Sequence, residues 1–204
     1  MSASAPFIIV TGNIAAGKST LINRLTGELG LRSHLERVED NPFFGTPSQR
    51  SLESETWFLV DSVMAHREIE RSGQGGLQER SAYEHVPVFA QARRRRGWLD
   101  ADEFALLRTL ADLLTDGLKP PDLLVYLEAD VQDLTARIAQ RARPGEQLLD
   151  PAYLAALDEL YDELVDGWRL SPVYRLDTTR VDVREEDGLR IACLGVERTL
   201  PSAT

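Results

Sequence analysis

The amino-acid sequence predicts an α/β fold in which helices cover both faces of a parallel sheet. Segments with strand character alternate with segments of helical spacing along the chain, and this alternation is typical of such a fold. Residues 123–127 form an unbroken apolar run, as expected of a central parallel strand that is buried on both faces. No internal repeat, low-complexity linker or break in composition divides the 204 residues. We therefore expect residues 1–204 to form a single domain.

The first half of the chain begins with an apolar run at 6–10, which predicts a buried strand. Apolar residues at helical spacing predict a helix over 18–29, and a short strand is expected near 33–38. A second helical pattern covers 51–71. It ends at the glycine-rich stretch 73–76, because glycine clusters break helices.

The second half of the chain continues the alternation of helices and strands. Pro120 and Pro121 separate a helical segment from the strand that follows it, and Pro144 and Gly145 end a later helical segment. The predicted elements are a short strand at 77–78, helices at 84–96 and 100–117, a strand at 123–127, helices at 131–142 and 151–167, a strand at 173–177 and a closing helix at 185–198.

Residues 12–19 match the phosphate-binding pattern G-x-x-x-x-G-K-[ST] at every position. Glycines let backbone N–H groups converge on phosphate oxygens, and the following helix adds the positive end of its dipole. The alternative is a glycine-rich turn of another kind, and the flanking strand and helix argue against it. We therefore expect a fold of the P-loop NTPase type. Its nucleoside triphosphate site would be formed by Gly12, Asn13, Ala15, Ala16, Gly17, Lys18, Ser19 and Thr20.

The amino-acid composition restricts the kinds of molecule that we expect this protein to bind. The hydrophobic fraction of 43% and the charged fraction of 27% are ordinary for a globular protein. The net charge of −10 argues against a nucleic-acid partner, because duplex binding needs a basic face. The one cysteine, Cys193, excludes an internal disulfide and lies in an apolar run, where we expect a buried, inert thiol. With no 18-residue apolar span and no secretory pattern at the N-terminus, we expect a cytoplasmic enzyme without a membrane partner.

Three further segments carry polar residues with the pattern of a kinase site. They are Leu-Glu-Arg-Val-Glu-Asp-Asn-Pro-Phe at 35–43, Gln-Glu-Arg-Ser-Ala-Tyr continuing to Val-Phe-Ala at 78–90, and the arginine-rich segment within 126–154. Together with the phosphate loop at 12–20, the order and spacing of these segments resemble the deoxynucleoside kinase family. The resemblance covers about residues 7–180.

This resemblance implies transfer of a phosphoryl group from ATP, bound with Mg²⁺, to the 5′-hydroxyl of a deoxynucleoside. Glu36 matches the carboxylate that accepts the hydroxyl proton, although Arg37 stands where the family usually has proline. Arg80 matches the arginine between the acceptor oxygen and the phosphates. Ser19 and Glu79 match the residues that hold magnesium. The resemblance also implies a homodimer packed through long helices.

The arginine-rich segment resembles the family's mobile lid, over about residues 137–150. Arg137 and Arg141 are four residues apart and share a helix face, and Arg143 follows closely. Three neighbouring guanidiniums would repel one another without an anion, and a polyphosphate suits them. A solvated arginine face is the alternative reading. In the family pattern Glu146 matches the residue that binds the sugar 3′-hydroxyl, and Tyr153 matches a tyrosine near the sugar.

The residues at the base-reading positions differ from those common in the family. Glu55, Ser62 and His85 stand where glutamine, arginine and aspartate are usual. An ionised carboxylate only accepts hydrogen bonds, so Glu55 could take both N1–H and N2–H of guanine. Phe89 would stack on the base. We therefore expect a preference for deoxyguanosine or another purine, with adenine or cytosine as alternatives. If the register slips near 44–56, Glu55 is instead a surface residue.

Two rival classes remain to be weighed. A thymidylate-type nucleoside monophosphate kinase would need cations, rather than Glu36, beside its acceptor phosphate. A switch GTPase needs an Asn-Lys-x-Asp loop, which Lys18 and Lys119 do not provide.

Of the other polar residues, the run of four arginines at 93–96 is expected to be exposed, because four consecutive residues cannot share a face. His34 and His66 are expected at the surface or its boundary.

Overall fold

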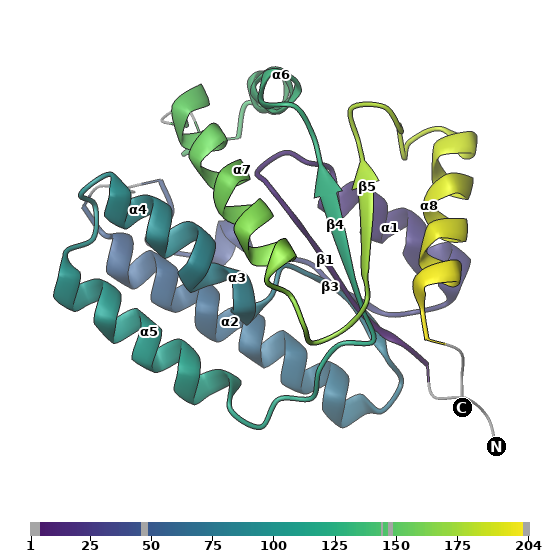
Figure 1. Cartoon of the computed structure of the whole chain (residues 1–204), viewed down its shortest axis with the longest axis horizontal. Helices are drawn as coiled ribbons and strands as arrows, with labels where there is room; N and C mark the ends of the chain where they lie inside the picture. The colour runs from purple at the N-terminus through teal and green to yellow at the C-terminus, as the bar shows by residue number, and fades with distance from the viewer. Residues whose placement is uncertain (1–4, 46–48, 144, 147–148, 202–204) are drawn as a thin grey trace.

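Five parallel strands form one sheet at the centre of the molecule (Figure 1). The structure is a computed structural model that describes residues 5–45, 49–143, 145–146 and 149–201. The strand order is β2-β3-β1-β4-β5, and each neighbouring pair is parallel. The strands are β1 (Phe7–Gly12), β2 (Ser33–His34), β3 (Gly76–Glu79), β4 (Leu123–Glu128) and β5 (Val173–Asp177).

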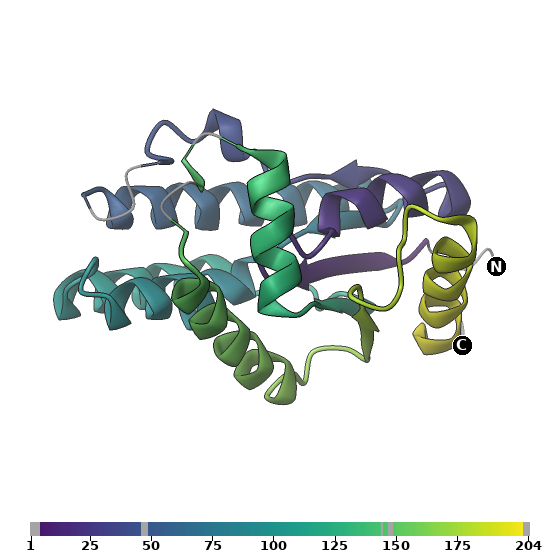
Figure 2. The same cartoon turned by 90° about the horizontal axis from the view of Figure 1, so that it is seen from above.

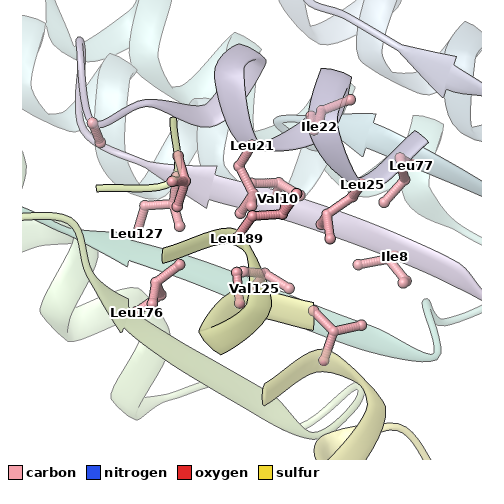
Figure 3. Close-up of a cluster of buried hydrophobic side chains, with 14 of the residues drawn as sticks. Ile8, Val10, Leu21, Ile22, Leu25, Leu77, Val125, Leu127, Leu176 and Leu189 are labelled. Atoms are coloured by element: carbon pink, nitrogen blue, oxygen red, sulfur yellow. The ribbon is translucent and has the colours of Figure 1, made fainter. Parts of the chain in front are cut away.

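One face of the sheet is covered by α1 (Lys18–Leu29) and α8 (Glu186–Thr199) (Figures 1 and 2). Alternate side chains of a strand point to opposite faces, so one set of strand residues meets these two helices. Figure 3 shows the resulting apolar cluster, in which strand residues pack against α1 and α8. Its fully or nearly fully buried members include Ile8, Val10, Val125, Leu21, Ile22, Leu25 and Leu189.

The opposite face is covered by the remaining long helices, which form a second apolar cluster with the other set of strand residues. The cluster joins Phe7, Ile9 and Leu124 of the strands to Leu157 and Leu160 of α7. The helices on this side are α2 (Ser51–Ser72), the short α3 (Ala82–Glu84), the π-helix η2 (His85–Ala90), α4 (Gln91–Arg95), α5 (Ala101–Thr115) and α7 (Pro151–Asp166). The helix α6 (Val131–Arg141) lies across the carboxyl end of the strands (Figures 1 and 2).

The predicted α/β fold with a parallel sheet and helices on both faces is confirmed, with two local differences. The strand expected near 33–38 covers only Ser33–His34, because the chain then leaves the sheet and forms the 3₁₀ turn η1 (Val38–Asp40). The helix expected at 84–96 is divided by η2. Pro87 lies within η2, and a proline inside an α-helix would lack its N–H donor and clash with the preceding turn.

His66 is not at the surface or its boundary, so that prediction is wrong. The side chain lies at the inner face of α2, is completely buried, and has Nε2 2.9 Å from the carbonyl oxygen of Lys119. The edge of its ring also contacts Phe7, with the two ring centroids 4.7 Å apart. His34, by contrast, is partly exposed as expected, with Nδ1 3.9 Å from Glu68. Among the described residues, no helix is long and apolar enough to cross a membrane.

Candidate active site

The phosphate loop joins β1 to α1 and depends on backbone conformations that glycine adopts easily. Gly12 has φ of 141°, and a Cβ atom there would meet the carbonyl oxygen of Leu127 at 2.5 Å. Gly17 has φ of 100° and precedes the first turn of α1. Since this φ region strains other residues, these two glycines allow the loop to wrap closely around the start of α1.

The predicted loop residues do not all play the same structural part. Ala15, Gly17, Ser19 and Thr20 line one pocket beside α6, together with Ala16 and Lys18; we call it the outer pocket. The Asn13 side chain instead braces the loop, since Nδ2 donates to the carbonyl oxygen of Leu154 at 2.9 Å. Only the backbone of Asn13 therefore remains for phosphate binding.

Lys18 is a buried cation at the base of the loop. Its Nζ donates to the carbonyl oxygens of Gly12 at 3.1 Å and Asn13 at 2.8 Å. Burial, and then the nearby charge of Arg80, lower the pKa of Lys18 to about 8. An anionic ligand would favour the protonated ammonium here, because an opposite charge within a few ångströms stabilises the charged form.

Ser19 and Glu79 bring together the oxygen atoms expected to hold magnesium. The Ser19 hydroxyl lies 2.8 Å and 3.0 Å from the two carboxylate oxygens of Glu79, at the end of β3. Among the described residues, no group of three or more His, Cys, Asp or Glu side chains could hold a metal ion. The hydroxyl and carboxylate pair fits Mg²⁺ all the same, since this ion is often held by one or two protein oxygens plus substrate phosphates.

Glu36, which is partly buried, and Arg80, which is buried, form an ion pair next to this cradle. Arg80 Nε lies 3.0 Å from Glu36 Oε2, and its Nη1 donates to the carbonyl oxygen of Gly12 at 3.3 Å. Burial acts to raise the pKa of Glu36, but the charges of Arg80 and Lys18 more than offset this, so the pKa is lowered. The carboxylate is therefore ionised near neutral pH and able to accept a proton.

A hydrogen-bond network that the sequence did not predict holds the Arg80 guanidinium in place. Glu84 is completely buried, and its Oε2 accepts hydrogen bonds from Thr11 and Tyr161, each at 2.6 Å, and from Arg80 at 3.2 Å. Tyr161 OH also accepts a hydrogen bond from Arg80 Nη1. The signal available in the sequence was the Ser-x-x-Glu spacing of Ser81 and Glu84, which forms a capping box at the start of α3.

A second pocket, which we call the inner pocket, opens on the other side of Lys18 and Ser19. The residues predicted for the acceptor side line it, although they come from distant parts of the chain, with the exception of Ser62, whose hydroxyl donates to the carbonyl oxygen of Leu59. They are Glu36, Glu55, Arg80, His85, Phe89, Glu146 and Tyr153. Lys18, Ser19, Glu79 and Arg141 line both the inner and the outer pocket, so the two pockets meet at the phosphate loop.

Glu55 lies deep in the inner pocket with only 1% of its surface exposed, so the alternative that placed it at the surface is wrong. Its Oε1 is 2.9 Å from Nε of Arg93, and its Oε2 is 3.8 Å from Nδ1 of His85. The prediction that residues 93–96 are all exposed is also wrong. Arg93 is buried, because the short helix α4 turns this side chain inward while Arg94 and Arg95 remain exposed.

Phe89 lines the inner pocket, and part of its ring already has partners. The Arg80 guanidinium lies 4.4 Å from the ring centroid, and Tyr161 meets the ring edge-on at 6.1 Å. His85 is tilted against the same ring at 6.1 Å. The aromatic surface predicted to stack on a base is thus rigidly held between polar groups of the site.

Each arginine of the predicted lid lies close to an oxygen atom of another residue, either a backbone carbonyl or the Glu146 carboxylate. Arg137 donates to the Thr178 carbonyl oxygen at 2.7 Å, at the end of β5. Arg141 Nη2 lies 2.6 Å from Oε1 of Glu146, and Arg143 Nη1 lies 3.8 Å from the same oxygen. Arg137 and Arg141 also line the outer pocket. Residues 144, 147 and 148 of the segment 137–150 lie outside the described residues.

Comparison with known proteins identifies the class of this site. The profile of the deoxynucleoside kinase family matches residues 8–192. The deoxyadenosine/deoxycytidine kinase of Bacillus subtilis is 29% identical over 186 residues, covering 88% of this chain and 86% of that protein. The deoxyguanosine kinase of the same organism is 30% identical over 167 residues, covering 78% of each chain.

A solved structure shares the fold. The deoxyadenosine kinase from M. mycoides with bound dATP superposes with a TM-score of 0.77 at 19% identity, covering 94% of this chain and 99% of that one. Because the family profile spans most of the sequence, the chain belongs to the deoxynucleoside kinase family. It is a kinase with a P-loop NTPase fold.

Proposed function

We propose that this kinase transfers the γ-phosphoryl group of ATP to the 5′-hydroxyl of a deoxynucleoside, preferring guanine as the base. The observation that carries the proposal is the meeting of the two pockets at Lys18, Ser19 and Glu79, with Glu36 and Arg80 on the inner side. A triphosphate in the outer pocket and a nucleoside in the inner pocket would place donor and acceptor on the two sides of one cradle.

On the acceptor side, Glu36 acts as the general base for the 5′-hydroxyl. Its lowered pKa keeps it ionised, and its partner Arg80 lies close enough to stabilise negative charge on the attacking oxygen and the transferred group. Glu146 and Tyr153 line the same pocket, and we assign Glu146 to the sugar 3′-hydroxyl. A neutral hydroxyl requires such a base, whereas an acceptor phosphate would be repelled by Glu36.

On the donor side, the loop N–H groups and Lys18 bind the β- and γ-phosphates, and Arg137 and Arg141 close over them. Arg143 lines the inner pocket and would approach the phosphates from the acceptor side. Ser19 and Glu79 would hold magnesium, which neutralises charge on the phosphate oxygens when it is bound with the triphosphate. Arg141 lines both pockets, so it can contact the phosphate that moves between donor and acceptor. These contacts orient the reactants, and orientation is the main protein contribution to phosphoryl transfer.

The guanine preference rests on Glu55. This carboxylate is buried at the inner pocket, and its Oε2 has no hydrogen-bond partner among the described residues. His85 Nε2 is likewise without a partner in the part of the chain that the structure describes, and it can donate to an acceptor atom of the base. Guanine presents two adjacent donors to a carboxylate, whereas adenine presents one donor and one acceptor. An unpaired polar edge would cost about 1–3 kcal/mol, or roughly tenfold to a hundredfold in preference.

The experiment is a transfer assay with [γ-³²P]ATP and each of the four deoxynucleosides and their monophosphates. We expect labelled monophosphates from nucleosides, with deoxyguanosine used most efficiently. Labelling of monophosphate substrates without labelling of nucleosides would instead identify a nucleoside monophosphate kinase. A preference for deoxyadenosine or deoxycytidine would leave the kinase assignment intact and remove the guanine assignment.

We also propose that the protein is a homodimer packed through α2 and α5. These two helices lie side by side on one face of the molecule (Figure 1). Met64 of α2 is 60% exposed and Leu113 of α5 is 68% exposed. Val60 and Leu106 add further exposed apolar surface, and they border the same groove as Met64. An apolar strip of this kind on a monomer indicates a protein interface.

A further inference from the structure

The deepest part of the inner pocket contains an ion pair that the reaction itself does not require. Glu55 of α2 and Arg93 of α4 are 1% and 8% exposed, and Nε of Arg93 lies 2.9 Å from Oε1 of Glu55. The arginine also reaches Ser51 Oγ at 3.4 Å through Nη1. A buried carboxylate is costly to keep ionised without a partner, so the arginine determines the charge of this part of the pocket.

Several other charged or titratable groups face Glu55 from the surrounding elements. The nearest is His85 of η2, with Nδ1 3.8 Å from Oε2 of Glu55, and Tyr153 of α7 lies within electrostatic range. Further groups line the same pocket from the phosphate loop, the segment after β2, the end of β3 and the lid: Lys18, Glu36, Glu79, Arg80, Arg141, Arg143 and Glu146. Arg93 is the permanent cation in direct contact with Glu55 among these described groups.

We propose that Arg93 is a positioning residue for base selection: it holds Glu55 as an ionised carboxylate that can only accept hydrogen bonds. This inference rests on the proposed function, because it assumes that Glu55 meets the base of the acceptor nucleoside. Arg93 forms an ion pair with Oε1, whereas Oε2 has no hydrogen-bond partner within the described ranges of the chain. Since each carboxylate oxygen has two lone-pair sites, both oxygens can still accept N–H groups from a base.

The alternative charge state of Glu55 would reverse the selection. A protonated carboxyl group offers one donor and one acceptor, the same pattern as the glutamine amide common at this position in the family. That pattern suits N1 and N6 of adenine rather than N1–H and N2–H of guanine. Burial without a cationic partner favours the protonated form of a carboxylic acid. Removal of the Arg93 charge should therefore make base preference depend on pH.

The direction in which the pKa of Arg93 is shifted agrees with this geometry. Burial by itself acts to lower the pKa of Arg93, but the Glu55 carboxylate and Tyr153 together more than offset this effect and raise it. The guanidinium thus remains charged throughout the pH range in which a kinase is assayed, so Arg93 itself adds no pH dependence to the wild-type preference.

The test is a competition assay in which equal concentrations of deoxyguanosine and deoxyadenosine are phosphorylated together between pH 5.5 and 8.5. The ratio of the two products reports base preference alone, because pH effects on shared catalytic groups cancel. In Arg93→Met, we expect a guanine-to-adenine ratio about tenfold below wild type at the acidic end. The ratio should rise toward the wild-type value as the pH increases, because Glu55 then ionises.

Matched variants distinguish the effect of the Arg93 charge on base preference from the effect of losing a packed side chain. Arg95→Met removes an exposed arginine of the same helix and should leave the ratio unchanged. Glu55→Gln should lower the ratio at every pH, and adding Arg93→Met to it should neither lower the ratio further nor restore a pH dependence. Should Arg93→Met fail to fold, Arg93→Lys keeps the cation and should retain the wild-type pH profile of the ratio.

Three results would overturn the assignment of Arg93. They are a wild-type ratio in Arg93→Met at all pH values, a pH-dependent ratio that persists in the Glu55→Gln background, and a tenfold loss of preference in Arg93→Lys. Failure of the proposed function looks different, since the wild-type protein would then phosphorylate neither nucleoside. A wild-type preference for deoxyadenosine would refute only the guanine assignment, and the pH dependence in Arg93→Met would still test Arg93.

Discussion

Arg80 combines an unfavourable backbone conformation with a complete set of side-chain partners. Its φ is 63°, in the left-handed region that costs a non-glycine residue about 1–2 kcal/mol. Such strain persists where the surroundings over-determine it, often at functional sites. The surroundings here are Glu36, Glu84 and Tyr161, which all contact the guanidinium. These contacts hold the guanidinium in place beside Glu36 and the phosphate loop.

The role of Glu36 predicts the effect of a neutral substitution. Glu36→Gln should lower kcat by about 100- to 10,000-fold, because a positioned general base contributes that much. ATP binding measured by calorimetry should remain close to wild type, since the amide leaves the phosphate cradle intact. Glu39→Gln alters an exposed neighbour and should keep full turnover. Undiminished kcat in Glu36→Gln would remove Glu36 from its proposed role.

The Tyr161 hydroxyl predicts a combined loss of stability and rate. Tyr161→Phe leaves buried Glu84 and Arg80 each without one partner, which should cost about 1–3 kcal/mol of unfolding free energy. Because Arg80 is then less well held, kcat should fall more than the affinity for the nucleoside. Denaturant titration and steady-state kinetics measure the two effects. Tyr174→Phe, on the opposite side of the sheet, is the control and should change neither by a comparable amount.

At the scale of elements, the site is formed where the parallel strands end. The end of β1 and the segment after it supply the phosphate loop, and the segment after β2 supplies Glu36. Glu79 is the last residue of β3, and Arg80 follows it. Ligands of open α/β sheets bind at this carboxyl edge. The π-helix η2 then carries His85 and Phe89 into the inner pocket. Pi-helical turns are frequent at functional sites because they redirect side chains within an otherwise regular helix.

The contact of α2 with the segment before β4 predicts a pH dependence of stability. Burial lowers the pKa of His66, and the hydrogen bond to Lys119 only partly opposes this. The unfolded chain then binds a proton more readily than the folded protein, so the free energy of unfolding should fall as pH decreases below about 6.5. His66 contributes no such loss above that pH, where both states are neutral.

Thermal unfolding between pH 5 and 8 tests this effect of His66. His66→Gln can keep a hydrogen bond to the Lys119 carbonyl oxygen but cannot titrate. Its unfolding temperature should therefore depend less steeply on pH than that of the wild-type protein. His34→Gln changes a partly exposed histidine and should retain the wild-type slope. Parallel slopes for wild type and His66→Gln would show that His66 does not carry the effect.

At the scale of the whole molecule, positively charged side chains cluster around one site of a protein whose net charge is negative. The net charge is −10, yet Lys18, Arg80 and Arg141 line the pockets that meet at the phosphate loop. Local positive charge in a cleft raises the concentration of an anionic ligand there. The acidic remainder of the surface would repel nucleic acids, so the charge distribution favours small anions such as a nucleoside triphosphate.

The apolar strip on α2 and α5 predicts the behaviour of the proposed dimer. Met64→Glu combined with Leu113→Glu should shift sedimentation from dimer to monomer, because four charges would be buried at a two-fold interface. Leu170→Glu changes an exposed leucine elsewhere and should leave the mass unchanged. A wild-type protein that sediments as a monomer at micromolar concentration would contradict the proposal.

Local patterns in the sequence were sufficient to predict the main helices and strands and the phosphate loop. The loop lies between a strand and a helix that adjoin it in the chain, and its glycines are required by backbone sterics alone. Glu36, Glu79 and Arg80 were anticipated from the resemblance to the deoxynucleoside kinase family, and they lie at or just after the ends of β2 and β3, where strand ends converge at one edge of the sheet.

Only the tertiary structure decided which side chains meet across helices. Arg93 differs from Arg94 and Arg95 because α4 packs against α2 and α7, and no pattern within four identical residues shows which one turns inward. His66 and Glu84 are buried for the same reason, as they face elements distant in the sequence. Local sterics set the loop and the strands, whereas the charge and polarity of the base pocket depend on how separate helices pack.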